Sequence, residues 1–179
     1  TGLATFNIAS AATVAGGTWL TATATHLATG DTSEFSGQIA AVMSAPSVST
    51  TGSALSYVEN DPATAIDPGL VITDPDSTNL TGATVRISGN YVIGEDGLAF
   101  TDQLGITGTW NAALGVMTLS GTSSVANYQN ALRSITYVNT SDNPSTALRT
   151  VEFSVSDGTS NSNTATRNVN VTAVADHLV

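Results

Sequence analysis

The sequence contains neither cysteine nor lysine among its 179 residues. The lack of cysteine excludes disulfides, which stabilise many small secreted animal domains. The lack of lysine excludes Lys–Asn isopeptide cross-links between side chains. Whatever stabilises this chain must therefore be non-covalent, or must come from a bound ion.

Charge is also scarce, since charged residues make up 10% of the chain. Four arginines oppose 14 acidic residues, which gives a net charge of −10. Nucleic acids and anionic membrane surfaces are bound through basic patches, so neither is an expected partner. The excess of acid favours a cationic partner, most simply a metal ion.

Long apolar runs are missing as well. No stretch approaches the ~20 apolar residues that span a bilayer, so we expect no membrane insertion. The chain opens at Thr1 on a strand-like pattern and not on a signal peptide. Together with the absence of Cys and Lys, this predicts an internal or processed piece of an exported bacterial repeat protein. The expected location is secreted, extracellular or on the cell surface.

What the sequence does contain is β pattern. Thr, Val and Ile alternate with small polar residues, and Gly, Asn and Asp interrupt them at short intervals. Evenly spaced short strands favour an all-β sandwich or barrel. Strands are predicted near 54–59, 69–73, 82–89, 97–101, 105–110, 115–121, 134–139, 150–157 and 164–173.

One helix is predicted, from Ser124 to Leu132. Ser124 is a suitable N-cap, and Val125, Tyr128 and Leu132 follow the i, i+3, i+7 spacing of one helical face.

The chain divides into three predicted parts. Residues 1–36 form a β-hairpin segment, with Phe6 and Ile8 in a first strand, a turn at Gly16-Gly17 and a second strand over 18–25. Two strands alone are marginal in water, so this segment must dock on something else. Residues 37–53, rich in Ser, Thr and Gly and containing Pro46, are predicted to be a linker. Residues 54–179 form the main domain.

The main domain resembles a known class of module. The ranges 55–77, 80–101, 105–145 and 151–174 are similar to bacterial cadherin-like tandem modules of large RTX-type surface adhesins. The resemblance implies an immunoglobulin- or cadherin-like sandwich of seven to nine antiparallel strands, joined head to tail with calcium at the junctions. Residues 18–36 resemble the last strand and tail of a different bacterial extracellular repeat, with His26 and Asp31 at positions where that tail usually has Asp and Asn.

Calcium takes six to eight oxygen ligands, so a junction site needs acids from several loops. The resemblance directs attention to six candidate metal ligands, namely Glu59, Asp61, Asp74, Asp76, Asp157 and Asp176. The alternative is ordinary turn chemistry, because Asp is common in Asp-Pro and Asp-Gly turns. A second acidic patch, Glu95-Asp96-Gly97 with Asp102, is predicted to be a solvated hairpin loop.

Catalysis finds no support in the sequence. There is no Gly-x-Ser-x-Gly elbow, and His26 and His177 have neither zinc-site nor triad spacing. The aromatics, Trp19 and Trp110 among them, are predicted to be core residues, and the arginines are predicted to pair with surface acids. No organic cofactor and no enzyme activity are expected.

Three functions stay open at this point. The first is a non-catalytic structural or adhesion module rigidified by calcium, with neighbouring modules or identical subunits as partners. The second is a calcium-dependent carbohydrate-binding module, with a polysaccharide as partner. The third is a filament subunit, in which residues 1–36 complete a neighbouring subunit by strand addition.

Overall fold

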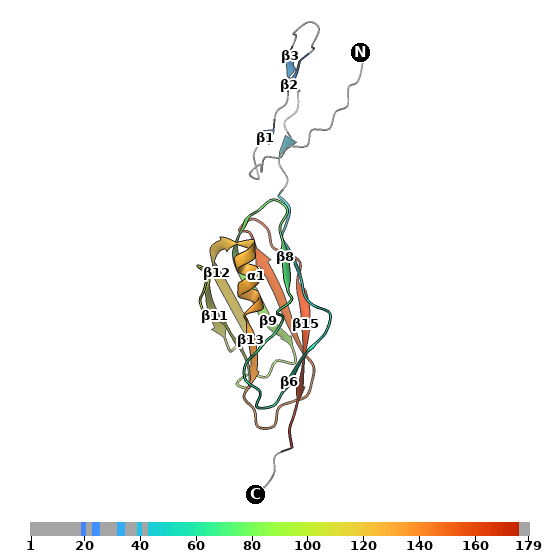
Figure 1. Cartoon of the computed structure of the whole chain (residues 1–179), viewed down its shortest axis with the longest axis vertical. Helices are drawn as coiled ribbons and strands as arrows, with labels where there is room; N and C mark the ends of the chain where they lie inside the picture. The colour runs from blue at the N-terminus through green and yellow to red at the C-terminus, as the bar shows by residue number, and fades with distance from the viewer. Residues whose placement is uncertain (1–18, 21–22, 26–31, 35–38, 41–42, 176–179) are drawn as a thin grey trace. The chain divides into compact units, whose positions relative to one another are not determined.

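The computed structural model describes residues 19–20, 23–25, 32–34, 39–40 and 43–175. The chain divides into two compact units, Thr1–Ser44 and Ala45–Val179 (Figure 1).

The described strands of the first unit are β1 (Trp19–Leu20), β2 (Thr23–Thr25), β3 (Thr32–Glu34) and β4 (Ile39–Ala40). β2 pairs antiparallel with β3, and β1 pairs antiparallel with β4, so the pairs are nested as in a hairpin. The strand predicted over 18–25 therefore pairs with residues that follow it. The earlier predicted strand and the turn at Gly16-Gly17 lie outside the described residues.

The second unit is a β-sandwich, which confirms the predicted fold class. A six-stranded sheet with the order β11-β12-β9-β14-β15-β6 packs against a three-stranded sheet, β10-β13-β7, and the pair β5-β8 (Figure 1). The strands are β5 (Ser47–Ser49), β6 (Leu55–Val58), β7 (Thr64–Ala65), β8 (Val71–Thr73), β9 (Asn79–Gly89), β10 (Asp96–Ala99), β11 (Thr107–Asn111), β12 (Val116–Ser124), β13 (Thr136–Asn139), β14 (Arg149–Ser156) and β15 (Ala165–Thr172).

Strict alternation of burial produces the core between these sheets. In β14 every second residue is buried, including Val151, Phe153 and Val155. Val85 and Ile87 in the central strand β9 are buried on the same pattern, as the sequence predicts. Burying each such side chain stabilises the fold by roughly 1.5–3 kcal/mol. The alternate, outward positions are mostly Thr, Ser and Asn, which suit a solvated face.

Helix α1 (Val125–Arg133) matches the predicted helix closely. Ser124 is its N-cap, and the Ser124 hydroxyl accepts a hydrogen bond from the Asn127 amide at 3.1 Å. Tyr128 and Leu132 are fully buried against the sandwich, and the Tyr128 hydroxyl donates to the Gly121 carbonyl at 2.6 Å. Packing on this one face holds a helix too short to be stable alone.

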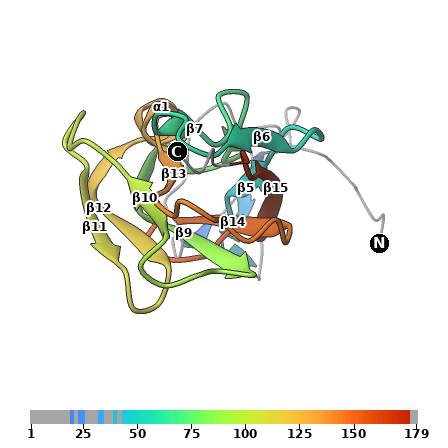
Figure 2. The ribbon, with the colours of Figure 1, turned by 90° about the horizontal axis from the view of Figure 1, so that it is seen from below.

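Strand number and direction differ from the expectation of seven to nine antiparallel strands. Residues 45–175 form 11 strands, because short β5 and β7 add to the nine predicted ranges. β6 also pairs in parallel with β15, with Leu55 opposite Val169 and Val58 opposite Thr172. The chain passes from the β5–β8 pair to the six-stranded sheet between Ser49 and Leu55, and this crossing brings β6 beside β15 (Figure 2).

The predicted linker over 37–53 is wrong in its second half. β5 lies within it, Val48 is 2% exposed, and the Val48 amide donates to the Asn163 side chain at 3.0 Å. A three-residue strand with one apolar residue is too short to show alternation, and the Ser/Thr content around it imitates a linker. The compact unit begins at Ala45 and not at Ala54.

Two truncations test this boundary. Removal of residues 1–44 should leave the melting temperature of the sandwich unchanged, because all the buried core residues of the described part lie at Val48 or later. Removal of residues 1–53 should cost at least about 2 kcal/mol of unfolding free energy, since it deletes buried Val48 and its hydrogen bonds. Urea denaturation of both proteins measures the difference, and equal stabilities would contradict the assignment of β5 to the sandwich.

Candidate functional site

Glu59 lies where β6 and β15 end together, at the end of the sandwich that we call the exit pole. Its side chain is 4% exposed, and one carboxylate oxygen accepts a hydrogen bond from the Val174 amide at 2.7 Å. The Glu59 amide donates to the Thr172 carbonyl at 2.9 Å. The other oxygen, Oε1, is buried and has no hydrogen-bond partner among the described residues. A buried carboxylate oxygen without a donor is costly unless a cation lies beside it.

Asp61 lies beside Glu59 at the same pole, but its carboxylate is exposed. It accepts a hydrogen bond from the Val58 amide at 3.0 Å, and Asn60 between the two acids has a φ of 68°. The Asp61 carbonyl accepts from the Tyr57 hydroxyl at 2.6 Å. This tight turn points two acids of one loop to the exit pole. Asp176, predicted as a metal ligand in the C-terminal tail, lies outside the described residues.

Asp74, Asp76 and Asp157 belong to the opposite end, which we call the entrance pole. Asp74 follows β8 and Asp157 follows β14. Ser47 links their two loops, because it pairs with Thr73 and its hydroxyl donates to the Asn163 side chain at 3.2 Å.

The two loops of the entrance pole are ordinary Asp turns with one unusual feature. Asp74 Oδ1 accepts from the Ser77 amide at 2.9 Å, and Asp157 Oδ1 accepts from the Thr159 and Ser160 amides at 2.6 Å each. In both residues the second oxygen, Oδ2, is buried and has no hydrogen-bond partner among the described residues.

The predicted ligands are therefore divided between two poles. The eight residues of β14 separate these ends by about 26 Å at 3.3 Å per residue. Over the described ranges, no three Asp, Glu or His side chains come together as a metal-binding group. A single sandwich thus offers two partial sets of oxygen ligands.

Asp96 is the main residue that the sequence interpretation placed wrongly. It was expected in a solvated loop, but it is 4% exposed at the start of β10. Tyr137 and Asn139 of β13 donate to its Oδ1 at 2.5 and 2.7 Å, and the Val92 amide donates to its Oδ2 at 2.8 Å. Asp96 and Leu98 share one face of β10, so strand alternation was the signal that predicted burial.

Arg149 completes this network from the other sheet. Its side chain is fully buried, and its Nε lies 3.3 Å from Asp96 Oδ2 in an ion pair. Its Nη1 donates to the carbonyls of Ser145 and Ala147. The expectation that the arginines pair with surface acids is wrong for Arg149, whose alternation with Val151 and Phe153 directs it inward.

A second ion pair joins Asp67 to Arg167 at 3.0 Å, and both side chains are at least nine-tenths buried. The Asp67 carboxylate also accepts from the Thr51 amide at 2.8 Å and from the Gly69 amide at 3.1 Å. Sequence reasoning missed Asp67, because its Asp-Pro-Gly context is typical of an exposed turn. Arg167 also lines a small polar depression of about 210 Å³, together with residues 50–54 and with Thr166 and Asn168.

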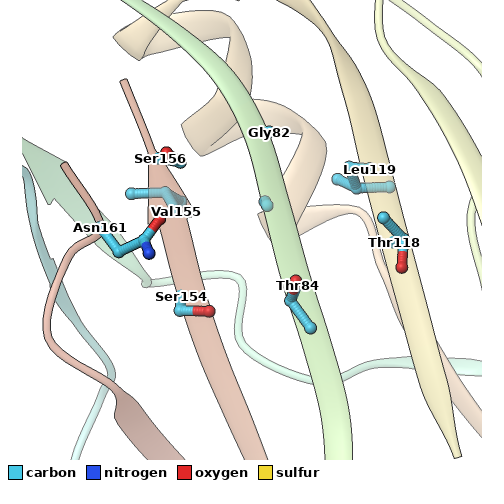
Figure 3. Close-up of a pocket in the computed structure, with 9 residues that line it drawn as sticks. Gly82, Thr84, Thr118, Leu119, Ser154, Val155, Ser156 and Asn161 are labelled. Atoms are coloured by element: carbon cyan, nitrogen blue, oxygen red, sulfur yellow. The ribbon is translucent and has the colours of Figure 1, made fainter. Parts of the chain in front are cut away.

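Another depression, of about 160 Å³, lies on the six-stranded sheet (Figure 3). Small side chains of β9, β12 and β14 form it, with Gly82 leaving space at its centre and Asn161 at its rim. No titratable group lines it, so it offers no acid–base or nucleophilic chemistry.

The aromatic side chains that the structure describes mostly serve the core. Tyr57 and Tyr137 are fully buried and meet edge to face, with ring centroids 5.1 Å apart. Tyr91 and Trp110 pack on one another at 6.2 Å. The side chain of Trp19 lies outside the described part.

Burial, followed by the hydrogen bond to Asp96, raises the pKa of Tyr137 well above its ordinary value. Burial also raises the pKa values of Tyr128 and Tyr91. The neutral phenol of Tyr137 is the form that can donate to the Asp96 carboxylate.

Comparisons with known proteins add one relationship. The chain is similar to a segment of Halomucin from Haloquadratum walsbyi. The two are 37% identical over 123 residues, which cover 66% of this chain and 1% of that protein. No family model and no solved structure matches the chain. The chain thus spans only a small part of a far longer protein, and the similarity does not specify the cadherin-like RTX type of module. No helix in the described part has the length and hydrophobicity to cross a membrane.

The Asp96 network makes a stability prediction. Asp96→Ala should cost about 3–5 kcal/mol of unfolding free energy, because it leaves the Arg149 guanidinium buried without its counter-charge. Exposed Asp142→Ala should cost less than about 0.5 kcal/mol. Urea titration measures the unfolding free energy of both variants. A decrease of less than about 1 kcal/mol in Asp96→Ala would show that the Asp96–Arg149 ion pair is not needed for the stability of the fold.

The raised pKa of Tyr137 predicts alkaline sensitivity. The folded state keeps the phenol protonated above pH ~10, where an unfolded tyrosine ionises, so its stabilisation is present below pH 10 and is lost as the pH rises further. Unfolding free energies measured from pH 8 to 11 should fall less steeply in Tyr137→Phe than in the wild type. Identical slopes would exclude Tyr137 as a contributor.

Proposed function

We propose that the sandwich is a non-catalytic structural or adhesion module of a long tandem-repeat surface protein. We further propose that successive modules join pole to pole through calcium. The match to 1% of a far longer protein supports a modular context. Where this chain repeats within a longer protein or assembles with identical subunits, the exit pole of one module would meet the entrance pole of the next.

The observation that carries the calcium proposal is the distribution of buried carboxylate oxygens without donors. Glu59 Oε1 is such an oxygen at the exit pole, and Asp74 Oδ2 and Asp157 Oδ2 are such oxygens at the entrance pole. Orphaned buried acceptors in a native fold call for an explanation, and an ion is the simplest one for carboxylates. Their placement at the two ends of the sandwich favours a role in connection.

The donor set fits calcium well. Carboxylates and backbone carbonyls are hard oxygen ligands, and calcium accepts six to eight of them in flexible geometry. Neither pole supplies that number in the described residues, whereas two facing poles would combine Glu59 and Asp61 with Asp74, Asp76 and Asp157. Bound calcium would fix the angle between modules and stabilise the folded state by mass action.

The two alternatives have less support. A carbohydrate-binding module needs an exposed aromatic platform. Tyr57, Tyr128 and Tyr137 are buried in the core, and the partly buried Tyr91 and Trp110 pack edge to face on one another. Strand addition by residues 1–36 needs an unpaired donor strand, whereas the four short strands described in this unit, β1–β4, pair with one another.

A protein with two tandem copies of residues 45–179 tests the junction. Calcium at millimolar concentration should raise its melting temperature by several degrees over the single sandwich, and a chelator should reverse the shift. Glu59→Gln in the first copy, or Asp157→Asn in the second, should abolish the gain because each removes a ligand at the junction.

The same substitutions in the other copies are the matched controls. Glu59→Gln in the second copy and Asp157→Asn in the first lie at the free outer poles, so each should retain the calcium-dependent gain. If calcium shifts the tandem and single proteins equally, and metal analysis finds no bound ion, the pole-to-pole proposal is wrong.

A further inference from the structure

Three Asn-x-Ser/Thr triplets in the main domain match the acceptor pattern for N-linked glycans. They are Asn79-Leu80-Thr81, Asn139-Thr140-Ser141 and Asn170-Val171-Thr172. The pattern alone does not decide which asparagine can carry a sugar. The folded chain must leave the amide nitrogen and a large volume beyond it open to solvent.

Asn170 meets this requirement. It lies in β15 between Val169 and Val171, which are both buried, so its own side chain points away from the core. Asn170 and Thr172 are both exposed on the outer face of the six-stranded sheet, and the residue paired with Asn170 is the small Ser56. Among the described residues, no hydrogen bond to the side-chain amide of Asn170 would have to break when a saccharide is attached.

Asn79 also has a side chain that is open to solvent. It is the first residue of β9 and is exposed, while the next residue, Leu80, is fully buried and anchors the strand. Its backbone exchanges hydrogen bonds with the Ser77 hydroxyl, whereas no described residue engages its side-chain amide.

Asn139 does not meet this requirement. This residue is 5% exposed, and its Nδ2 donates to Asp96 Oδ1 at 2.7 Å inside the ion-pair network. Its side-chain oxygen accepts from the Ser141 amide at 3.0 Å. A saccharide on this nitrogen would have to displace the packing around Asp96 and Arg149.

We propose that Asn170 and Asn79 are N-glycosylation acceptors and that Asn139 is not. The proposal rests on the export that the proposed function implies. A transferase would join Nδ2 to the anomeric carbon of a saccharide carried on a lipid phosphate or diphosphate. The bond from that carbon to the phosphate oxygen breaks, the lipid phosphate leaves with the electron pair, and Nδ2 gives one proton to the transferase. Asn170 lies on the sheet face and outside the pole loops, so its glycan is compatible with joined modules.

Secretion of the full chain, directed by an added signal, from a eukaryotic host with an N-glycosylation pathway tests the proposal. Treatment of the folded product with peptide-N-glycosidase in ¹⁸O-water converts each formerly glycosylated asparagine to labelled aspartate. Mass spectrometry should find the label at Asn170 and Asn79 and not at Asn139. T172V, which keeps the side-chain shape but removes the hydroxyl of the triplet, should lose the Asn170 glycan and retain the one at Asn79.

The matched control is N170T, which removes one acceptor and completes a triplet that starts at Asn168. Asn168 is exposed two residues earlier in the same strand, so the glycan should move to it. An unlabelled Asn170 or Asn79, or a label at Asn139 in folded protein, would overturn the proposal. Because the added signal imposes export and no calcium is needed, the result is independent of whether modules join through calcium.

Discussion

The sandwich depends on a buried ion pair between its two layers. Asp96 belongs to the three-stranded sheet and Arg149 to the six-stranded sheet, and Tyr137 and Asn139 hold the carboxylate in place. Buried ion pairs add little net stability compared with apolar packing, but their geometry is exacting. The network therefore fixes which residues of the two sheets face each other. The Tyr57 hydroxyl extends it by donating to the Asn139 and Asp61 carbonyls, which connects the core to the exit pole.

Two groups of acids in the described part differ in what balances their charge. Asp96 and Asp67 are satisfied inside the fold by arginines, so the chain uses two of its four arginines internally. Glu59, Asp74 and Asp157 at the poles form no ion pair with an arginine of the described part, and each has one buried carboxylate oxygen without a hydrogen-bond partner there. In a chain without disulfides or isopeptide bonds, the first group organises the module and the second is available to an external cation.

Strand alternation made most of the fold predictable. Long strands such as β9 and β14 and the helix capped by Ser124 repeat their pattern often enough to be recognised. β5 and β7 were missed because two or three residues cannot show a period. Asp96 and Arg149 were misplaced because charge was given more weight than alternation. The division of the acids between the two poles could not be predicted from the sequence around each acid, since it depends on where each strand ends in space.

The parallel pairing of β6 with β15 has a mechanical consequence. These are the second and the last strand of the sandwich, and they run side by side in the same direction. A pulling force that enters through the residues before Leu55 and leaves through those after Thr172 would slide the two strands along each other. In this shear geometry all the hydrogen bonds between them share the load and must break together, whereas strands peeled from one end would lose them singly. The β6–β15 pair would therefore resist a force that pulls the two strands in opposite directions along their length.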